Sequence, residues 1–263
     1  MLRLKKSLGQ NFLSDNNIIK KIASLDNLKN QTILEIGPGS GNLTEFIIKK
    51  QPKKIILIEK DQRFCELLKK KFGHQKDLEI HNKDILEYTF DEVSLKDSII
   101  FGNLPYNIST QILAKFISLK TWPPFFKKII FMFQKEVADR ILAKYNTKEY
   151  GRISVLANFR LEMVENFKIS RNCFFPKPAV DSKIIVFKPK MKFNYKIRNI
   201  KNLEKITNIF FSNKRKMINK PLSKIFKEYK NIAKQLSLNL NSRPSELSSD
   251  DYCRLTEFYE KFN

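Results

Sequence analysis

The sequence has few cysteines and histidines and no long apolar run. Its three cysteines, Cys65, Cys173 and Cys253, lie far apart and form no Cys-x-x-Cys pair. This excludes a disulfide framework and a zinc-ribbon pattern, and it favours a reducing compartment. The two histidines, His74 and His81, lack metal-ligand spacing, so no metal is expected. No apolar stretch approaches the roughly 20 residues that span a bilayer, so we expect no membrane association.

Acidic residues are scarce relative to basic ones. The 263 residues include 50 Lys and Arg but only 27 Asp and Glu, which gives a formal net charge of +23. Such an excess favours a polyanionic partner, with nucleic acid as the first candidate. The alternative is that many lysines only solvate helix faces or reflect genome composition. At 42% hydrophobic residues the chain is globular, and its length allows two modules.

The first two thirds of the chain alternate between short apolar runs and amphipathic stretches, which predicts βαβ units around a mainly parallel sheet. The predicted strands are Thr32 to Ile36, Lys54 to Glu59, Leu78 to His81, Ser98 to Gly102 and Lys128 to Phe133. The predicted helices are Asn42 to Lys50, Asp61 to Lys71, Ser109 to Leu119 and Lys135 to Tyr145, preceded by a helix capped by Asp15.

The pattern changes after Gly151. A short helix over Ile153 to Phe159 and two late strands, Leu161 to Ile169 and Ser182 to Phe187, would complete the sheet with an antiparallel edge. Beyond Lys188-Pro189-Lys190 the sequence predicts only helices: Leu203 to Phe211, Pro221 to Tyr229, Asn231 to Leu236 and Asp250 to Phe262.

We therefore predict an α/β domain over residues 1–189 and a small α-helical domain over residues 190–263. The second domain holds 17 Lys or Arg against 7 Asp or Glu, so it is the candidate for nucleic-acid binding. Within it, Phe210 to Lys216 brings aromatic and basic residues together. That segment is either a nucleic-acid contact or an ordinary amphipathic helix end.

A glycine-rich loop follows the first predicted strand. In Glu35-Ile36-Gly37-Pro38-Gly39-Ser40-Gly41 an acid at a strand end precedes three glycines at alternate positions and then a helix. Glycine allows a tight turn and close approach of a ligand, and the helix amides offer donors. A dinucleotide fingerprint needs a sixth-position glycine where Asn42 stands. The loop instead resembles motif I of Rossmann-like S-adenosylmethionine methyltransferases, and Gly37 and Gly39 are its candidate ligand contacts.

Acidic residues at the next two strand ends extend this interpretation. Glu59 ends the second strand about 20 residues after the loop and could accept hydrogen bonds from ribose hydroxyls. Asp84, followed by Ile85, ends the third strand, where a carboxylate could accept the amino protons of the cofactor adenine. The alternative for a single strand-end acid is a turn or cap residue. Three such positions in the right order favour cofactor binding.

The segment Asn103-Leu104-Pro105-Tyr106 follows the fourth strand, at the sheet edge where α/β proteins bind ligands. Adenine N6 is a poor nucleophile, and the Asn103 side-chain carbonyl and the Leu104 backbone carbonyl could hold it as acceptors. Pro105 biases Leu104 toward extended geometry. Tyr106 offers a ring for a flipped base and a cation–π contact to a sulfonium. The alternative is a proline turn with a buried tyrosine.

Several motifs together resemble the KsgA/RsmA family of ribosomal RNA adenine dimethyltransferases. They are Gly9 to Leu13 (G-Q-N-F-L), Glu35 to Gly41, Asn103 to Thr110 (N-L-P-Y-N-I-S-T), Gln134 to Val137, Tyr150 to Val155, Phe174 to Ser182 (F-F-P-K-P-A-V-D-S) and a basic C-terminal helix like Asn213 to Leu222. The resemblance implies dimethylation of N6 of two adjacent adenosines near the 3′ end of 16S rRNA, with S-adenosyl-L-methionine as cofactor, in the immature small subunit.

The resemblance also implies roles for particular residues. Asn11 and Leu13 would close over the cofactor, Gly37 would contact it, and Asn103 would serve both cofactor and target. Phe174 would stack on the base opposite Tyr106, although its neighbour Phe175 is aromatic too. Because the motif Gly9 to Leu13 begins at residue 9 and belongs to the catalytic domain, we expect no cleavable organelle presequence. We expect a cytoplasmic protein and a monomer.

There are two alternatives to this function: a methyltransferase with a different RNA target, and a protein without catalytic activity. The erythromycin-resistance type of methyltransferase performs the same reaction on 23S rRNA, but it typically carries isoleucine where Leu104 stands. A non-catalytic assembly or RNA-binding factor could use the same fold, although the intact motif residues at Gly37, Glu59, Asp84 and Asn103 argue against it.

Overall fold

The computed structural model of the chain describes residues 11–262. These residues belong to two compact units. Unit 1 contains the chain up to Leu113 together with Pro124–Ala138 and Met163–Pro189. Unit 2 contains Ala114–Pro123, Asp139–Glu162 and the residues from Lys190 onward. Gly9 and Gln10 of the first motif lie outside the described residues.

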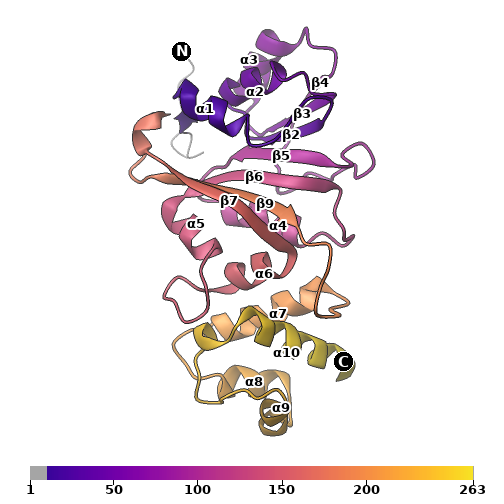
Figure 1. Cartoon of the computed structure of the whole chain (residues 1–263), viewed down its shortest axis with the longest axis vertical. Helices are drawn as coiled ribbons and strands as arrows, with labels where there is room; N and C mark the ends of the chain where they lie inside the picture. Colours follow the sequence, from indigo (N-terminus) through magenta and orange to yellow (C-terminus); the bar gives the residue numbers. More distant parts are fainter. Residues whose placement is uncertain (1–10, 263) are drawn as a thin grey trace. The chain divides into compact units, whose positions relative to one another are not determined.

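A seven-stranded sheet forms the centre of unit 1 (Figure 1). Its strand order is β4-β3-β2-β5-β6-β9-β7. The strands β4, β3, β2, β5 and β6 pair in parallel, and β9 pairs antiparallel with β6. Their bounds are β2 Thr32–Ile36, β3 Lys54–Glu59, β4 Leu78–Asn82, β5 Ser98–Asn103, β6 Phe126–Gln134, β7 Leu161–Ile169 and β9 Ser182–Pro189. The predicted α/β fold and the antiparallel addition are confirmed.

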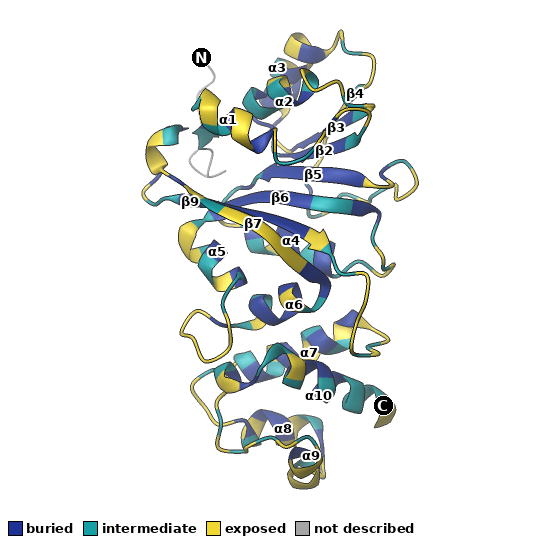
Figure 2. Cartoon of the chain, in the orientation of Figure 1, coloured by how far each residue is buried: buried dark blue, intermediate teal, exposed yellow. Residues whose placement is uncertain are grey.

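The strands occupy apolar runs because the sheet is covered on both faces in its centre. Figure 2 shows β2, β3 and β5 buried along almost their whole length, as parallel strands usually are. The edge strand β7 is different, since all its residues from Glu162 to Glu165 are exposed. The two predicted strands Thr32 to Ile36 and Lys54 to Glu59 match the observed bounds at both ends.

Helices before and between the strands supply the cover. They are α1 Asn16–Ile22, α2 Asn42–Ile48, α3 Gln62–Phe72, α4 Ser109–Ile117 and α5 Lys135–Ile141. The Asp15 carboxylate caps α1 by accepting the N–H groups of Asn17 and Ile18 at 2.9 and 3.1 Å, as predicted. Asp61 begins α3 in the same way.

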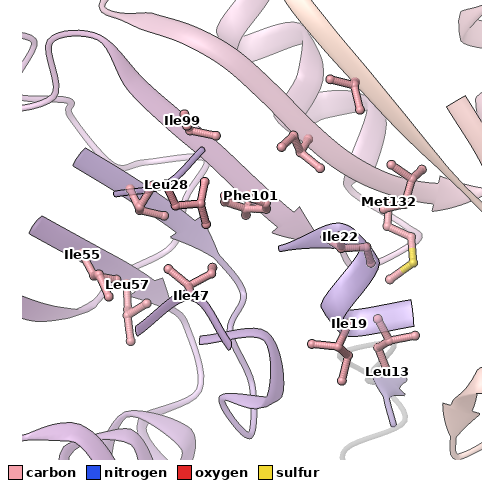
Figure 3. Packing of buried hydrophobic residues seen from close by; sticks show 14 of the residues in the cluster. Leu13, Ile19, Ile22, Leu28, Ile47, Ile55, Leu57, Ile99, Phe101 and Met132 are labelled. Atoms are coloured by element: carbon pink, nitrogen blue, oxygen red, sulfur yellow. The ribbon is translucent and has the colours of Figure 1, made fainter. Parts of the chain in front are cut away.

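One face of the sheet forms the main apolar core of unit 1. Alternate residues of neighbouring strands contribute to it, such as Ile55 with Leu57 and Ile99 with Phe101, because side chains alternate across a strand. Ile19 and Ile22 of α1, Ile47 of α2, and Leu68 and Phe72 of α3 pack against them, as the close-up in Figure 3 shows for several of these residues.

Unit 2 is helical. Its helices are α6 Arg152–Arg160, α7 Ile200–Phe211, α8 Asn219–Ile225, α9 Tyr229–Gln235 and α10 Ser249–Phe262, with a 3₁₀ turn at Pro244–Glu246. Because α6 packs against both α7 and α10, the C-terminal helices share their unit with earlier segments. The compact units therefore do not follow the linear division between residues 189 and 190. Among the described residues no helix is long and apolar enough to cross a membrane.

The basic helix expected over Asn213 to Leu222 is not continuous. α7 ends at Phe211, residues 212–218 form turns, and α8 begins only at Asn219. The Lys214 ammonium donates to the carbonyls of Lys148 and Tyr150 at 2.6 and 2.5 Å, which holds this turn within unit 2. The expectation of one helix was wrong because lysine-rich composition does not distinguish a helix from a turn.

Candidate active site

A cavity of about 330 Å³ lies at the carboxyl ends of β2, β3, β4 and β5. This is the edge at which parallel α/β sheets bind their ligands, and the volume falls in the range of small-molecule sites. All lining residues belong to unit 1. The predicted site residues among them are Asn11, Gly37, Gly39, Glu59, Asp84, Ile85, Asn103, Leu104, Pro105 and Tyr106. Leu13 lines a smaller neighbouring cavity instead.

The glycine loop forms one wall of the cavity and requires glycine at two positions. Gly37 and Gly39 have φ angles of +65° and +55°, in the left-handed region that side chains disfavour. A Cβ atom on Gly39 would lie 2.3 Å from the ring of Phe12. A side chain at either position would therefore strain the loop, and at Gly39 it would also displace a neighbouring wall residue.

Glu59 joins this loop to the end of β3. Its carboxylate accepts the Gly39 N–H at 3.1 Å and the Asp61 N–H at 2.9 Å. Burial raises the pKa of Glu59, and the hydrogen bonds from the Asp61 and Gly39 amides oppose that rise. Each carboxylate oxygen has a second lone pair, so Glu59 can still accept hydroxyl groups of a ligand in the cavity.

Asp84 lies two residues after the end of β4. One carboxylate oxygen accepts the Leu86 N–H at 2.9 Å, and the other pairs with the Lys60 ammonium at 2.7 Å. This carboxylate raises the pKa of the exposed Lys60. The next residue, Ile85, is buried and adds an apolar surface to the cavity wall. Lys60 was not among the predicted site residues, because its only sequence signal is its position directly after Glu59.

Asn103 is held by a contact across 92 residues of sequence. Its side-chain N–H donates to the Asn11 carbonyl at 3.2 Å. This hydrogen bond assigns the amide nitrogen to Asn11 and leaves the Oδ1 atom as an acceptor. After it, the Ile108 N–H donates to the Pro105 carbonyl at 3.2 Å, which turns the chain from β5 into α4.

Tyr106 is fixed at its hydroxyl. The hydroxyl group is 3.0 Å from the Ser182 Oγ atom, and Ser182 is fully buried at the start of β9. Burial raises the pKa of Tyr106, and the Ser182 hydrogen bond only partly opposes it. The phenol is therefore neutral near pH 7, and the ring has a defined place at the cavity wall. Sequence analysis included Ser182 in a motif but gave it no role.

Two short strands bring the first motif beside the Phe174 segment. β1, Phe12–Leu13, pairs antiparallel with β8, Phe174–Phe175. Side chains alternate along a strand, so Phe174 lies in the apolar core at 4% exposure whereas Phe175 is 61% exposed. The Phe174 ring does not line the cavity, which differs from the stacking position expected for it. Of the two rings, only Phe175 is accessible.

Glu35, the acid of the glycine motif, is directed into the protein. It is 2% exposed, and its carboxylate accepts the Thr44 hydroxyl at 2.7 Å. Burial is the main cause that raises the pKa of Glu35 to about 7; the Thr44 hydrogen bond opposes the rise and the neighbouring Glu59 adds to it. Glu35 thus ties the end of β2 to α2.

Comparison with known proteins identifies the family. A model described as ribosomal RNA adenine dimethylase matches residues 1–261. The chain belongs to this family. Two curated relatives are named ribosomal RNA small subunit methyltransferase A. The Pelagibacter ubique protein is 45% identical over 259 residues and covers 98% of each chain. The protein of Wolbachia sp. subsp. Drosophila simulans (strain wRi) is 36% identical over 266 residues, and the match covers 99% of this chain and 95% of the relative.

Solved structures of family members and relatives have the same fold. A dimethyladenosine transferase from Plasmodium falciparum superposes with a TM-score of 0.75 at 27% identity and covers 95% of this chain and 98% of its own. The 23S rRNA methyltransferase ErmE superposes with a TM-score of 0.68 at 22% identity over 95% of this chain and 99% of its own, which supports the fold alone. The Rossmann-like methyltransferase sheet predicted for the family is confirmed.

Proposed function

We propose that this chain transfers methyl groups from S-adenosyl-L-methionine to N6 of two adjacent adenosines near the 3′ end of 16S rRNA. The immature small ribosomal subunit in the cytoplasm would be its substrate, and the chain would act as a monomer. One observation carries the proposal: a single cavity is lined by the glycine loop, Glu59, Asp84 and the Asn103 to Tyr106 segment.

The cavity fits the cofactor in the chemistry of its donors and acceptors. Gly37 and Gly39 leave room for a ligand against the backbone, Glu59 keeps lone pairs for ribose hydroxyls, and Asp84 with Ile85 offers an acceptor beside an apolar wall. When bound there, S-adenosylmethionine supplies a methyl group on a positively charged sulfur. Leu13, paired with Phe174, lines the smaller neighbouring cavity together with Gly37 and Asn103.

Asn103 and Leu104 would hold the target nitrogen. The Asn103 amide is anchored on the Asn11 carbonyl, so its Oδ1 atom and the Leu104 carbonyl can accept the two N6 protons. Two acceptors on these protons favour a pyramidal nitrogen whose lone pair is available for attack. Pro105 contributes no competing N–H group. The residues thus work by positioning the nucleophile, and no strongly basic side chain is needed.

Tyr106 would hold the target base by stacking. Its hydroxyl is anchored on Ser182, which restricts the ring before RNA binds, and stacking on an aromatic ring contributes about 1–3 kcal/mol per base. The exposed ring of Phe175 is our candidate for a second contact with the RNA. Phe174 instead stabilises the segment that carries Phe175, because the Phe174 ring is part of the core.

Unit 2 would supply most of the attraction for the RNA backbone. It holds 24 Lys or Arg against 10 Asp or Glu, a net charge of +14 out of the +23 of the chain. Near α7, Arg215 and Lys216 are exposed, whereas Phe210 is buried and Lys214 binds backbone carbonyls. The exposed cations would therefore contact the phosphates, and RNA binding should weaken as the salt concentration rises.

The deciding experiment measures methyl incorporation from labelled S-adenosylmethionine. Small subunits that lack the modification should accept label at two adjacent adenosines of 16S rRNA. Asn103→Ala should reduce transfer roughly 100-fold or more, the scale on which a preorganised polar contact acts in an active site. RNA binding by this variant should be unchanged.

A matched control is Asn166→Ala, since Asn166 is exposed on β7 of the same unit and lies outside the cavity. It should transfer label like the unchanged chain. Label that enters 23S rRNA in place of 16S rRNA would contradict the proposed substrate. Equal loss of RNA binding and transfer in Asn103→Ala would contradict the role given to Asn103.

A further inference from the structure

The segment that follows β9 has a distinct composition. Residues 190–199 contain four basic residues and no acidic one: Lys190, Lys192, Lys196 and Arg198. Among them stand Met191, Phe193 and Tyr195. Lys192 and Asn194 are exposed, and Met191 is 65% exposed. Basic residues that alternate with apolar and aromatic ones are typical of surfaces that bind single-stranded nucleic acid.

Phe193 is supported by an aromatic cluster within unit 2. Its ring centre is 5.0 Å from that of Phe159, with the planes inclined by 35°, and 6.5 Å from that of Trp122. The buried Arg160 guanidinium lies 4.4 Å from the Trp122 ring centre and donates to the carbonyls of Ile117 and Leu119. These contacts hold Phe193 in place although it remains 37% exposed.

A pocket of about 80 Å³ lies beside Phe193. Its lining includes Asn158, Asn194, Lys190, Lys192 and Asp250. The buried Cys253 thiol also lines it; burial first, and then the Asp250 carboxylate, raise the pKa of this thiol to about 12, so it stays protonated. The pocket thus combines aromatic rings, two asparagines, two lysines (Lys190 and Lys192) and one aspartate.

We propose that this pocket binds one unpaired nucleotide of the RNA, with its base against the Phe193 ring. That the ligand is RNA rests on the proposed function. The Asp250 carboxylate can accept the amino protons of a base, and the Asn194 amide can pair with other base-edge atoms. Lys192 can contact the adjoining phosphate. This pocket is separate from the methyl-transfer cavity, which is lined only by unit 1 residues.

The test uses the full-length chain and a short single-stranded RNA that carries the fluorescent base 2-aminopurine, whose emission falls when it stacks. Phe193→Ala should weaken binding by roughly 5- to 150-fold, the range that corresponds to one stacked base. Phe193→Leu keeps apolar bulk without an aromatic face and should also weaken binding. Phe193→Trp should bind as the unchanged chain does. Quenching should be lost in the Ala and Leu variants.

Phe262→Ala is the matched control, because Phe262 is a 69% exposed ring of unit 2 outside the pocket. It should leave RNA binding unchanged. The proposed nucleotide pocket would be contradicted if Phe193→Leu bound RNA as tightly as the unchanged chain. It would also be contradicted if Phe193→Leu and Phe262→Ala lost the same amount of RNA affinity. If the Phe193 variants lost as much affinity for a fully paired RNA duplex as for the single strand, stacking of an unpaired base on Phe193 would be contradicted. Absence of methyl transfer by the unchanged chain would overturn the proposed function alone, and RNA binding that depends on Phe193 would still support the pocket.

Discussion

The buried carboxyl of Glu35 should make the fold less stable as the pH rises. Its pKa lies at about 7 in the folded chain against an ordinary 4.5, chiefly because the group is buried. Between these pH values the folded chain holds a proton that the unfolded chain has lost. The free energy of unfolding therefore falls through this window as the pH rises. At about 1.4 kcal/mol per pKa unit, the whole loss from Glu35 is about 3 kcal/mol.

Glu35→Gln should remove this dependence, since glutamine is neutral and its amide oxygen can still accept the Thr44 hydroxyl. The assay is urea unfolding of the cofactor-free chain at a series of values between about pH 5 and 8. The unchanged chain should lose about 2.5 kcal/mol more than Glu35→Gln over this range, since part of the whole loss falls below pH 5. Other titrating groups contribute to both proteins and cancel in the difference.

Glu45→Gln provides the control on the adjacent helix. Glu45 is exposed, and the Lys49 ammonium lowers its pKa below the window. This variant should follow the unchanged chain across the window. Parallel unfolding profiles for the unchanged chain and Glu35→Gln would refute the reasoning, because they would mean that Glu35 is ionised in the fold at no cost.

Three further predictions concern the cavity and unit 2. Ser182→Ala removes the partner of the Tyr106 hydroxyl and should lower kcat by roughly 2- to 10-fold, the scale of one hydrogen bond, in the methyl-transfer assay. Gly39→Ala places a Cβ 2.3 Å from a neighbouring ring and should weaken cofactor binding roughly 10-fold or more by calorimetry. Arg160→Met leaves two backbone carbonyls without their donor and should cost about 2–4 kcal/mol in thermal unfolding.

Each of these three predictions has a control variant or a result that would contradict it. Ser182→Thr, which keeps a hydroxyl, should restore part of the rate, and a Ser182→Ala enzyme with full kcat would contradict the anchoring of Tyr106. A Cβ on Gly151 would come no closer than 3.9 Å to any other atom, so Gly151→Ala should leave cofactor affinity unchanged. Undiminished stability of Arg160→Met would show that these carbonyls find other partners.

The strands of the sheet could be predicted from sequence because they satisfy a local rule. Thr32–Ile36 and Lys54–Glu59 are apolar runs that end at a polar residue or a glycine, and such runs have no stable place except the interior of a covered sheet. The positions of Glu59, Asp84 and Asn103 followed directly, because the carboxyl ends of parallel strands share one edge.

Other parts of the site had no local signal. The pairing of Leu13 with Phe174 joins two-residue strands, which are too short for any periodicity. Without that register, the buried and the exposed member of the Phe174-Phe175 pair cannot be distinguished. The anchoring of Asn103 by a backbone carbonyl was also invisible, because every residue has a carbonyl and only the tertiary fold selects one.

The pairing of β1 with β8 also bears on synthesis of the chain. Phe12 lines the cavity and pairs with Phe175, its register partner. These two residues leave the ribosome roughly 8–30 s apart at about 5–20 residues per second. Strands β2 to β5 can assemble during that time, but the wall at Phe12 cannot be completed. A nascent chain that stops before residue 175 would thus carry the glycine loop without its full enclosure, and the cofactor would be enclosed only after about two thirds of the chain has been made.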